Sequence, residues 1–217
     1  MMSAGGERGY FISLEGIEGV GKTSNVAFVA DLLRAATIET VVTREPGGTP
    51  LAEQLRALML AHRDEVVDPL TEVLLMFAAR RQHLTEVIEP ALAAGRWVVC
   101  DRFTDATLAY QGYGRGFDID RIRALATWCH ADGWPDLTLV LDADIDTALS
   151  RRRGRGDTAD RFEVEDVDFF SDVRAGYLRA AAEEPERIAV IDASRELRHV
   201  QTAIREQVTG FVERVLV

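Results

Sequence analysis

Residues 11–25, FISLEGIEGVGKTSN, place an apolar run directly before a glycine-rich turn and a polar segment with helical character. Gly16, Gly21, Lys22 and Thr23 match the pattern G-x-x-x-x-G-K-S/T, which requires a preceding strand and a following helix. The glycines allow successive backbone N–H groups to turn toward an anion, and the helix N-terminus adds positive potential. The segment therefore predicts an α/β fold with a P-loop that binds a nucleoside triphosphate.

Lys22 is the only lysine of the chain, although lysine and arginine together number 25. An ammonium group is a compact point charge, whereas a guanidinium is a wide planar fork, so a narrow phosphate-binding loop admits the first and not the second. Thr23 supplies a hydroxyl for Mg²⁺. The residues that we expect to bind ATP here are Gly16, Ile17, Glu18, Gly19, Val20, Gly21, Lys22, Thr23 and Ser24.

Short apolar runs alternate with amphipathic segments along the whole chain. The runs are rich in Val and Ile, as strands buried on both faces are, and lie at 10–15, 38–43, 97–101, 137–143 and 187–193. Helical spacing occurs at 26–33, 70–94, 122–130, 147–153 and 196–216, and a helix also fits from Thr49 or Pro50. This alternation predicts one domain over residues 1–217, with a five-stranded parallel sheet, helices on both faces and ligands at the carboxyl ends of the strands.

The composition limits the possible classes of partner. A net charge of −11 argues against nucleic-acid binding, and no apolar run approaches the roughly 18 residues of a membrane span. Two cysteines, Cys100 and Cys129, are too few for a disulfide framework and fit a reducing cytoplasm. The four histidines have no ligand spacing, so we expect no metal held by the protein alone.

Cationic residues follow two of the predicted strands. Arg44 ends the second strand, and Asp101 and Arg102 end the third. An Asp at this edge is the usual carboxylate for a nucleotide-bound metal, and an Arg can bind a phosphate through two hydrogen bonds. A guanine-specific GTPase is excluded because its Asn-Lys-x-Asp element cannot occur here: the only asparagine, Asn25, does not precede the only lysine, Lys22.

Six segments resemble the bacterial thymidylate kinases in order and spacing: EGIEGVGKT, TREPGGTPLAE, LLMFAARRQHL, CDRFTDATLAYQGYGRG, PDLTLVLD and DRFE. Together they span residues 11 to about 170, which is most of the chain. The resemblance implies transfer of the γ-phosphoryl group of ATP to dTMP with Mg²⁺, giving dTDP and ADP, by a homodimer. Two rival interpretations are another P-loop kinase of deoxynucleotides or nucleosides, and a nucleotide-binding switch without catalysis.

The resemblance also implies roles for individual residues. Arg44 and Arg102 are expected on the dTMP phosphate, and Glu15 and Asp101 around Mg²⁺ and its waters. Tyr110 is expected against the deoxyribose, and Thr107 and Gln111 at the thymine edge. The side chain that stacks on the thymine base, with the arginine four residues later, is either Met76 with Arg80 or Phe77 with Arg81. Ala106 departs from the family, which commonly has Ser there.

The source of the catalytic arginine follows from Glu18. Some thymidylate kinases carry an arginine in the P-loop, but this chain has Glu18 there. The resemblance then implies that a lid at about residues 150–162 supplies the arginine. We favour Arg155, with Arg151, Arg153 and Arg161 as helpers.

Overall fold

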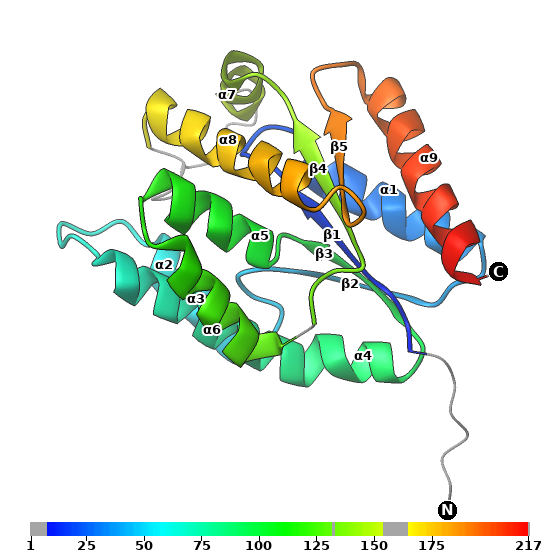
Figure 1. Ribbon diagram of the computed structural model, residues 1–217, viewed down its shortest axis with the longest axis horizontal. Helices are drawn as coiled ribbons and strands as arrows, with labels where there is room; N and C mark the ends of the chain where they lie inside the picture. Colours follow the sequence, from blue (N-terminus) through cyan, green and yellow to red (C-terminus); the bar gives the residue numbers. More distant parts are fainter. Residues whose placement is uncertain (1–7, 132, 154–164, 217) are drawn as a thin grey trace, which may run out of the picture.

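The computed structural model of the chain describes residues 8–131, 133–153 and 165–216. Five parallel strands form one sheet in the order β2-β3-β1-β4-β5 (Figure 1). Their bounds are β1 Phe11–Glu15, β2 Thr40–Arg44, β3 Trp97–Asp101, β4 Leu137–Asp142 and β5 Ile188–Asp192. β1 is buried along its whole length because it lies between β3 and β4, with Ser13 opposite both Cys100 and Thr138. The sheet confirms the predicted fold class.

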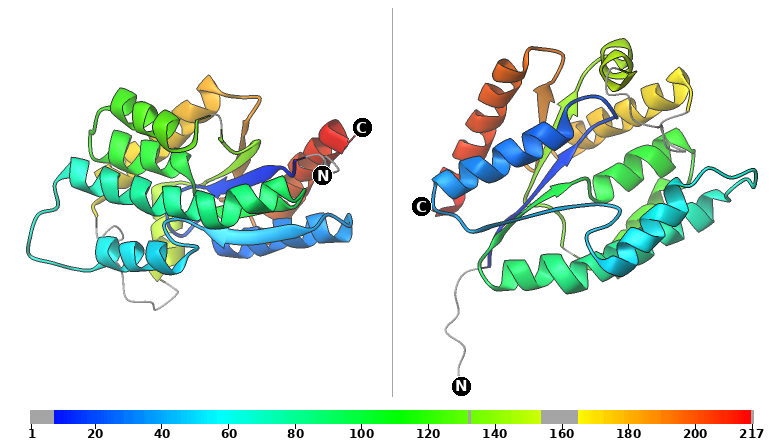
Figure 2. Two further views of the ribbon diagram at one scale, coloured as in Figure 1. Left: turned by 90° about the horizontal axis from the view of Figure 1, so that it is seen from below. Right: turned by 180° about the vertical axis from the view of Figure 1, so that it is seen from behind.

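Helices cover both faces of the sheet. α1 (Lys22–Ala35) and α9 (Leu197–Leu216) lie side by side on one face, as the right-hand view in Figure 2 shows. α4 (Glu89–Ala93) and α8 (Val167–Glu183) contact strands from the other face, with α3 (Pro69–His83) and α6 (Ile119–His130) packed beyond them. Within the described ranges, no helix is both long and apolar enough to cross a membrane. The two helical layers leave the carboxyl edge of the strands to the connecting segments.

The helix predicted at 70–94 is interrupted in its middle. It consists of α3, the π-helical segment η1 (Leu84–Ile88) and α4. Pro90 has no N–H to donate to the carbonyl four residues earlier, and the widened turn lies just before it. A second π-helical segment, η2 (Leu108–Gly114), follows the short α5 (Thr104–Thr107). π-helical turns occur frequently at functional sites, and η2 carries Tyr110 and Gln111.

Two helices complete the carboxyl side. α2 (Pro50–Leu60) begins as proposed: Thr49 caps it by accepting from the Ala52 N–H at 3.2 Å. α7 (Ile145–Arg153) starts near the end of β4.

α8 was not predicted, although Asp166 is a cap residue and Phe169, Phe170, Val173 and Tyr177 have helical spacing. These four apolar side chains are buried in the main core, so α8 was detectable from its pattern.

His130 predicts a loss of stability in acid. Its ring packs between Phe103 and Trp134, and its Nε2 lies 2.9 Å from Thr104 Oγ1. Burial, assisted by the positive charge of Arg80, lowers the pKa of His130 from 6.5 to about 4. The unfolded chain keeps the higher pKa and takes up the proton first, so stability is lost as the pH falls between these values. We expect this to cost at most about 2 kcal/mol at pH 5.

Replacing His130 by Gln, which keeps a polar partner for Thr104, isolates this contribution. Calorimetric melting at pH 7 and pH 5 is expected to show a smaller decrease in Tm for the variant than for the wild type. An equal decrease in both proteins would show that His130 is not responsible.

Candidate active site

The segment between β1 and α1 forms a tight loop over the sheet edge. Gly19 has φ 86°, and a Cβ there would lie 2.0 Å from the Ala148 carbonyl oxygen of α7, so only glycine fits. Gly21, also at positive φ, is the cap residue directly before α1 and has no side chain that could cap the helix. The first-turn N–H groups of α1 are therefore available to an anion, as in a phosphate-binding loop.

Lys22 lies within this loop and is only 8% exposed. Its Nζ donates to the carbonyl oxygens of Gly16 at 3.0 Å and Ile17 at 2.8 Å. Burial, with a contribution from nearby Arg102, lowers the pKa of Lys22 to about 8. Phosphate oxygens would favour the charged ammonium, so an anion in the loop and a protonated Lys22 stabilise one another.

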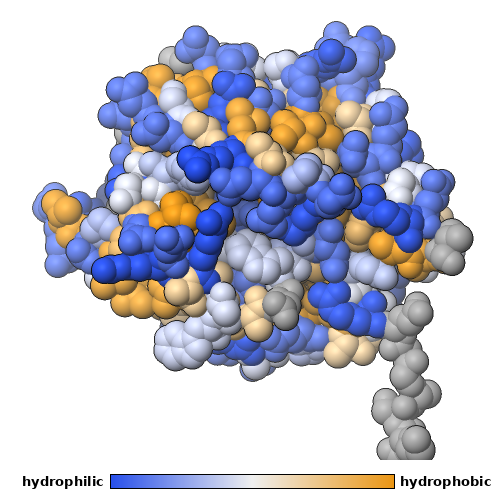
Figure 3. Space-filling model, in the orientation of Figure 1, coloured by the Kyte–Doolittle hydropathy of each residue, from blue (hydrophilic) through white to orange (hydrophobic). Residues whose placement is uncertain are grey.

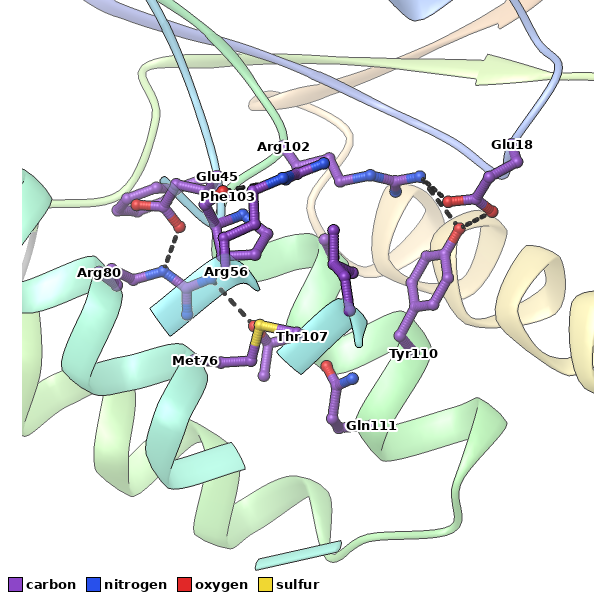
Figure 4. A pocket seen from close by; sticks show the side chains of 13 residues that line it. Glu18, Glu45, Arg56, Met76, Arg80, Arg102, Phe103, Thr107, Tyr110 and Gln111 are labelled. Atoms are coloured by element: carbon purple, nitrogen blue, oxygen red, sulfur yellow. Dashed lines mark hydrogen bonds and ion pairs between the residues drawn. The ribbon is translucent and has the colours of Figure 1, made fainter. Parts of the chain in front are cut away.

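A cavity opens beside the loop, at the carboxyl ends of β1, β2 and β3 (Figure 4). The lining combines apolar side chains with a few polar groups, which are contributed by the P-loop, the β2–α2 segment, α2, α3, the β3–α5 connection, α5 and η2. The lining residues are Glu18, Glu45, Pro46, Arg56, Leu60, Met76, Arg80, Arg102, Phe103, Ala106, Thr107, Tyr110 and Gln111.

Arg102 connects the P-loop with this cavity. Its Nη1 donates to Gly16 O at 2.9 Å, and its Nη2 donates to Glu18 Oε1 at 2.6 Å and Tyr110 Oη at 3.1 Å. Burial alone would raise the pKa of Glu18, but Arg102 and Lys22 together lower it. Burial raises the pKa of Tyr110, whose hydroxyl therefore stays protonated and donates to Glu18 at 2.6 Å. Both the P-loop carboxylate and the strand-end guanidinium thus line the cavity.

Glu15 is fully buried beneath this cluster. One carboxylate oxygen accepts from the Phe103 N–H at 2.6 Å and the other from the Tyr177 hydroxyl at 2.9 Å. Burial, together with the nearby carboxylate of Asp105, raises the pKa of Glu15 to about 8. Glu15 holds the start of the β3–α5 connection and links it to Tyr177 on α8.

Arg80 enters the cavity from α3 on a buried polar chain. Its Nε donates to Glu45 Oε2 at 2.7 Å and its Nη2 to Thr107 Oγ1 at 3.0 Å. His83 Nδ1 lies 3.0 Å from the other oxygen of Glu45, and its Nε2 lies 2.6 Å from Thr43 Oγ1. Arg80 and His83 lower the pKa of Glu45 despite its burial, so a carboxylate fixes the guanidinium. Arg80 Nη1 is buried without a hydrogen-bond partner among the described residues.

The family model for thymidylate kinase matches residues 14–204. The chain belongs to the thymidylate kinase family. It is 52% identical to a thymidylate kinase of Teredinibacter turnerae, over 94% of this chain and 99% of that one, and 56% identical to one of Methylococcus capsulatus, over 94% and 97%. The crystal structure of a thymidylate kinase from Ehrlichia chaffeensis has a TM-score of 0.77 and 33% identity, and the match covers 92% of this chain and 98% of that one.

In this member of the thymidylate kinase family, the cavity brings together one of the two alternative base-contacting pairs. Met76 and Arg80 line it. Phe77 instead packs with Val73, Leu108 and Ile122, and touches Arg80 from outside at 4.9 Å from Cζ to the ring centre. Arg81 is exposed and pairs with Glu89. Phe77 and Arg81 therefore do not reach the cavity, because one residue along a helix turns a side chain by about 100°.

Arg44 also lies outside the main cavity. Its Nη2 pairs with Glu53 at 2.7 Å, and it lines a neighbouring hollow together with Thr23 and Asp101. The guanidinium of Arg44 is directed to Glu53 in this arrangement, and its binding to the same phosphate as Arg102 stays a prediction. A hydroxyl at Thr23 and a carboxylate at Asp101 are oxygen donors of the kind that Mg²⁺ prefers. No cluster of three or more His, Cys, Asp or Glu side chains in the described ranges could hold a metal ion.

The lid arginines are described only in part. Arg151 donates to the carbonyl oxygens of Ala193 at 2.5 Å and Ser194 at 3.0 Å, and lines a third hollow beside Gly19 and Gly21 of the P-loop. Arg153 ends α7, and nothing further is described of it. Arg155 and Arg161 lie outside the described residues. The lid assignment therefore stays a prediction.

Three residues of the site were missed from the sequence. Glu45 follows Arg44 directly, and Arg56 lies three residues after the segment TREPGGTPLAE and donates to Pro46 O at 2.9 Å. Both were detectable, since they lie in or next to a segment that carries the resemblance. Tyr177 is distant in sequence from every motif, so only its helical spacing in α8 marked it as buried.

Proposed function

We propose that this chain transfers the γ-phosphoryl group of ATP to dTMP, giving dTDP and ADP. The observation that carries the proposal is the position of Arg102, which hydrogen-bonds to the P-loop backbone and at the same time lines the adjacent cavity. A donor phosphate in the loop and an acceptor phosphate at Arg102 would then be neighbours. Family membership and the match over nearly the full chain length support the same reaction.

The base of dTMP would lie between Met76 on α3 and the η2 side chains. Arg80 lines the cavity, and its guanidinium, which can only donate, suits the O4 acceptor of thymine. Thr107 and Gln111 line the same end of the cavity and can hydrogen-bond the base edge. Tyr110 would lie against the sugar and leave no space for a ribose 2′-hydroxyl.

The acceptor phosphate would replace a protein carboxylate. Glu18 accepts from both Arg102 and Tyr110. A dTMP phosphate would compete for the same two donors, and bidentate binding to the guanidinium would position it. Glu18 would then move toward the sugar or toward a lid arginine.

The donor nucleotide would occupy the P-loop, with its phosphates at the α1 N-terminus and Lys22. The rest of ATP would extend into the hollow that Arg151 lines. Mg²⁺ would bind with the nucleotide through Thr23 and Asp101, partly through water, and would neutralise phosphate charge. The protein side chains align the two phosphates and exclude water from between them.

The remaining cation would come from the lid. The P-loop has Glu18 where some relatives carry an arginine, so the P-loop does not supply the catalytic cation. Arg151 already donates to backbone carbonyl oxygens. Arg155→Ala is therefore expected to lower kcat about 10²-fold, with KM for dTMP changed less than threefold, because the lost charge acts on the transferring group. Steady-state kinetics at saturating ATP measure both constants, and unchanged turnover would remove Arg155 from the mechanism.

The substrate assignment is tested by ADP release with ATP and a panel of acceptors: dTMP, dUMP, dCMP, AMP and thymidine. We expect dTMP to have the highest kcat/KM. Activity confined to thymidine or to a ribonucleotide would indicate another kinase, and no acceptor-dependent ADP at all would indicate a nucleotide-binding switch.

We also propose a cytoplasmic homodimer. Leu70 and Leu74 on α3 and Trp128 on α6 are large apolar side chains that are 42%, 48% and 86% exposed. Figure 3 shows apolar patches at the left of the molecule, on the side where α3 and α6 lie. Exposed apolar area of this kind is often covered by a partner. Light scattering is expected to give twice the mass of one chain.

A further inference from the structure

A buried acidic side chain lies behind the η2 end of the cavity. Glu72, in the first turn of α3, is only 2% exposed. Its Oε1 accepts from Gln111 Nε2 at 2.8 Å, and Arg115 Nε lies 3.9 Å from the same oxygen. Arg115 is itself paired with Glu165 at 2.6 Å. Glu72 is thus the residue that contacts the back of Gln111, whose side chain lines the cavity.

The chemistry of a carboxylate fixes which way the Gln111 amide is turned. A carboxylate only accepts hydrogen bonds, whereas a carboxamide can donate through its nitrogen or accept through its oxygen. With Glu72 behind it, Gln111 must turn its nitrogen toward the carboxylate. The amide oxygen is left for the cavity, and in Figure 4 it lies on the side of Thr107.

The cavity consequently presents a defined pattern of polar atoms. Arg80 lines the cavity with a guanidinium that can only donate, and Gln111 lines it with Oε1 as an acceptor. A base edge with an oxygen beside an N–H, as in thymine, complements this pair. Cytosine has a donor at position 4 and an acceptor at position 3, so it would set donor against donor and acceptor against acceptor.

We propose that Glu72 is a positioning residue that selects the base by holding Gln111 in its acceptor orientation toward thymine N3–H. The inference rests on the proposed function and adds a specificity determinant that does not itself touch the substrate. Its counterpart is Glu45, which fixes the guanidinium of Arg80 by accepting a hydrogen bond from its Nε.

A purely structural role predicts a different result. An acidic residue in the first turn of α3 also stabilises the helix N-terminus, and its loss would weaken binding of every acceptor alike. Loss of the amide orientation would instead change the ratio between acceptors. The test therefore compares kcat/KM for dTMP with that for dCMP, or the inhibition constant of dCMP where its turnover is too slow.

The variant Glu72→Gln keeps the shape and allows Gln111 to turn either way. We expect the preference for dTMP over dCMP to fall roughly tenfold, about the effect of one hydrogen bond, with KM for ATP unchanged. Glu72→Asp keeps an acceptor-only group and should keep the preference even if Tm falls. The exposed Glu86→Gln is the matched control and should behave as wild type.

A residue exchange gives the decisive comparison. In the double variant Glu72→Gln with Gln111→Glu, the new carboxylate at 111 can only accept, so an acceptor again faces the base and the preference should recover. A preference in Glu72→Gln within twofold of wild type, or a double variant as unselective as Glu72→Gln, would overturn the proposal. Absence of dTMP phosphorylation by the wild type would instead overturn the proposed function.

Discussion

Lys22→Arg is expected to lower kcat for dTMP phosphorylation by at least about 10³-fold while the fold stays intact. The ammonium fits between the carbonyl oxygens of Gly16 and Ile17, 3.0 and 2.8 Å away, and the side chain is almost completely buried. A planar guanidinium is wider and would have to displace the loop or leave it. Its charge would then no longer lie where the outer phosphates of ATP need it.

The measurement is steady-state kinetics together with thermal melting by circular dichroism. Arg34→Lys is the matched control, because Arg34 lies at the exposed end of the same helix, paired with Asp31. It should leave kcat and Tm unchanged. A Lys22→Arg enzyme within tenfold of the wild-type turnover would contradict our explanation of why this arginine-rich chain has one lysine.

Arg102→Lys is expected to lower kcat/KM for dTMP by about 10³-fold. The guanidinium makes hydrogen bonds to Gly16, Glu18, Tyr110 and Tyr177 at once. An ammonium has its three donors at one point and cannot span the P-loop carbonyl and the acceptor cavity together. The donor and acceptor phosphates would no longer be positioned by the same side chain.

Calorimetric titration of dTMP, with and without a nonhydrolysable ATP analogue, separates binding from turnover for this variant. Arg198→Lys, at an exposed site paired with Glu196, serves as the control and should bind dTMP normally. Equal dTMP affinity and equal turnover in Arg102→Lys and wild type would remove Arg102 from the acceptor site.

The sequence was most informative where function depends on contiguous residues. The P-loop could be predicted because its glycines, Lys22 and Thr23 act through local backbone geometry. The strands could be predicted because burial on both faces requires unbroken Val and Ile runs. The position of α8 could have been inferred in the same way from Phe169, Phe170 and Val173.

Side-chain direction was less accessible. Met76 and Phe77 both fit an apolar helix surface, and only the packing of Phe77 against Val73 and Ile122 decides that Met76 lines the cavity. Arg44 lies at a strand end, and its contact with the acceptor phosphate stays a prediction. Its guanidinium meets Glu53 from the next helix, a contact that no local pattern specifies.

The buried network around Arg80 shows the same limit. Thr43 lies in β2, Glu45 lies in the segment after β2, and His83 lies in α3. They meet only when the sheet edge and the helix pack together. Each residue alone is an ordinary polar side chain in the sequence. The role of Glu45 therefore followed from tertiary structure.

The central claim is that a phosphoryl group passes from the P-loop to an acceptor in the cavity at Arg102. Incubation with ATP labelled at the γ-phosphate, with dTMP as the only acceptor, tests it most directly. The account predicts that the label appears in dTDP, and that little is released as inorganic phosphate. Label found only in inorganic phosphate, with none in dTDP, would contradict it.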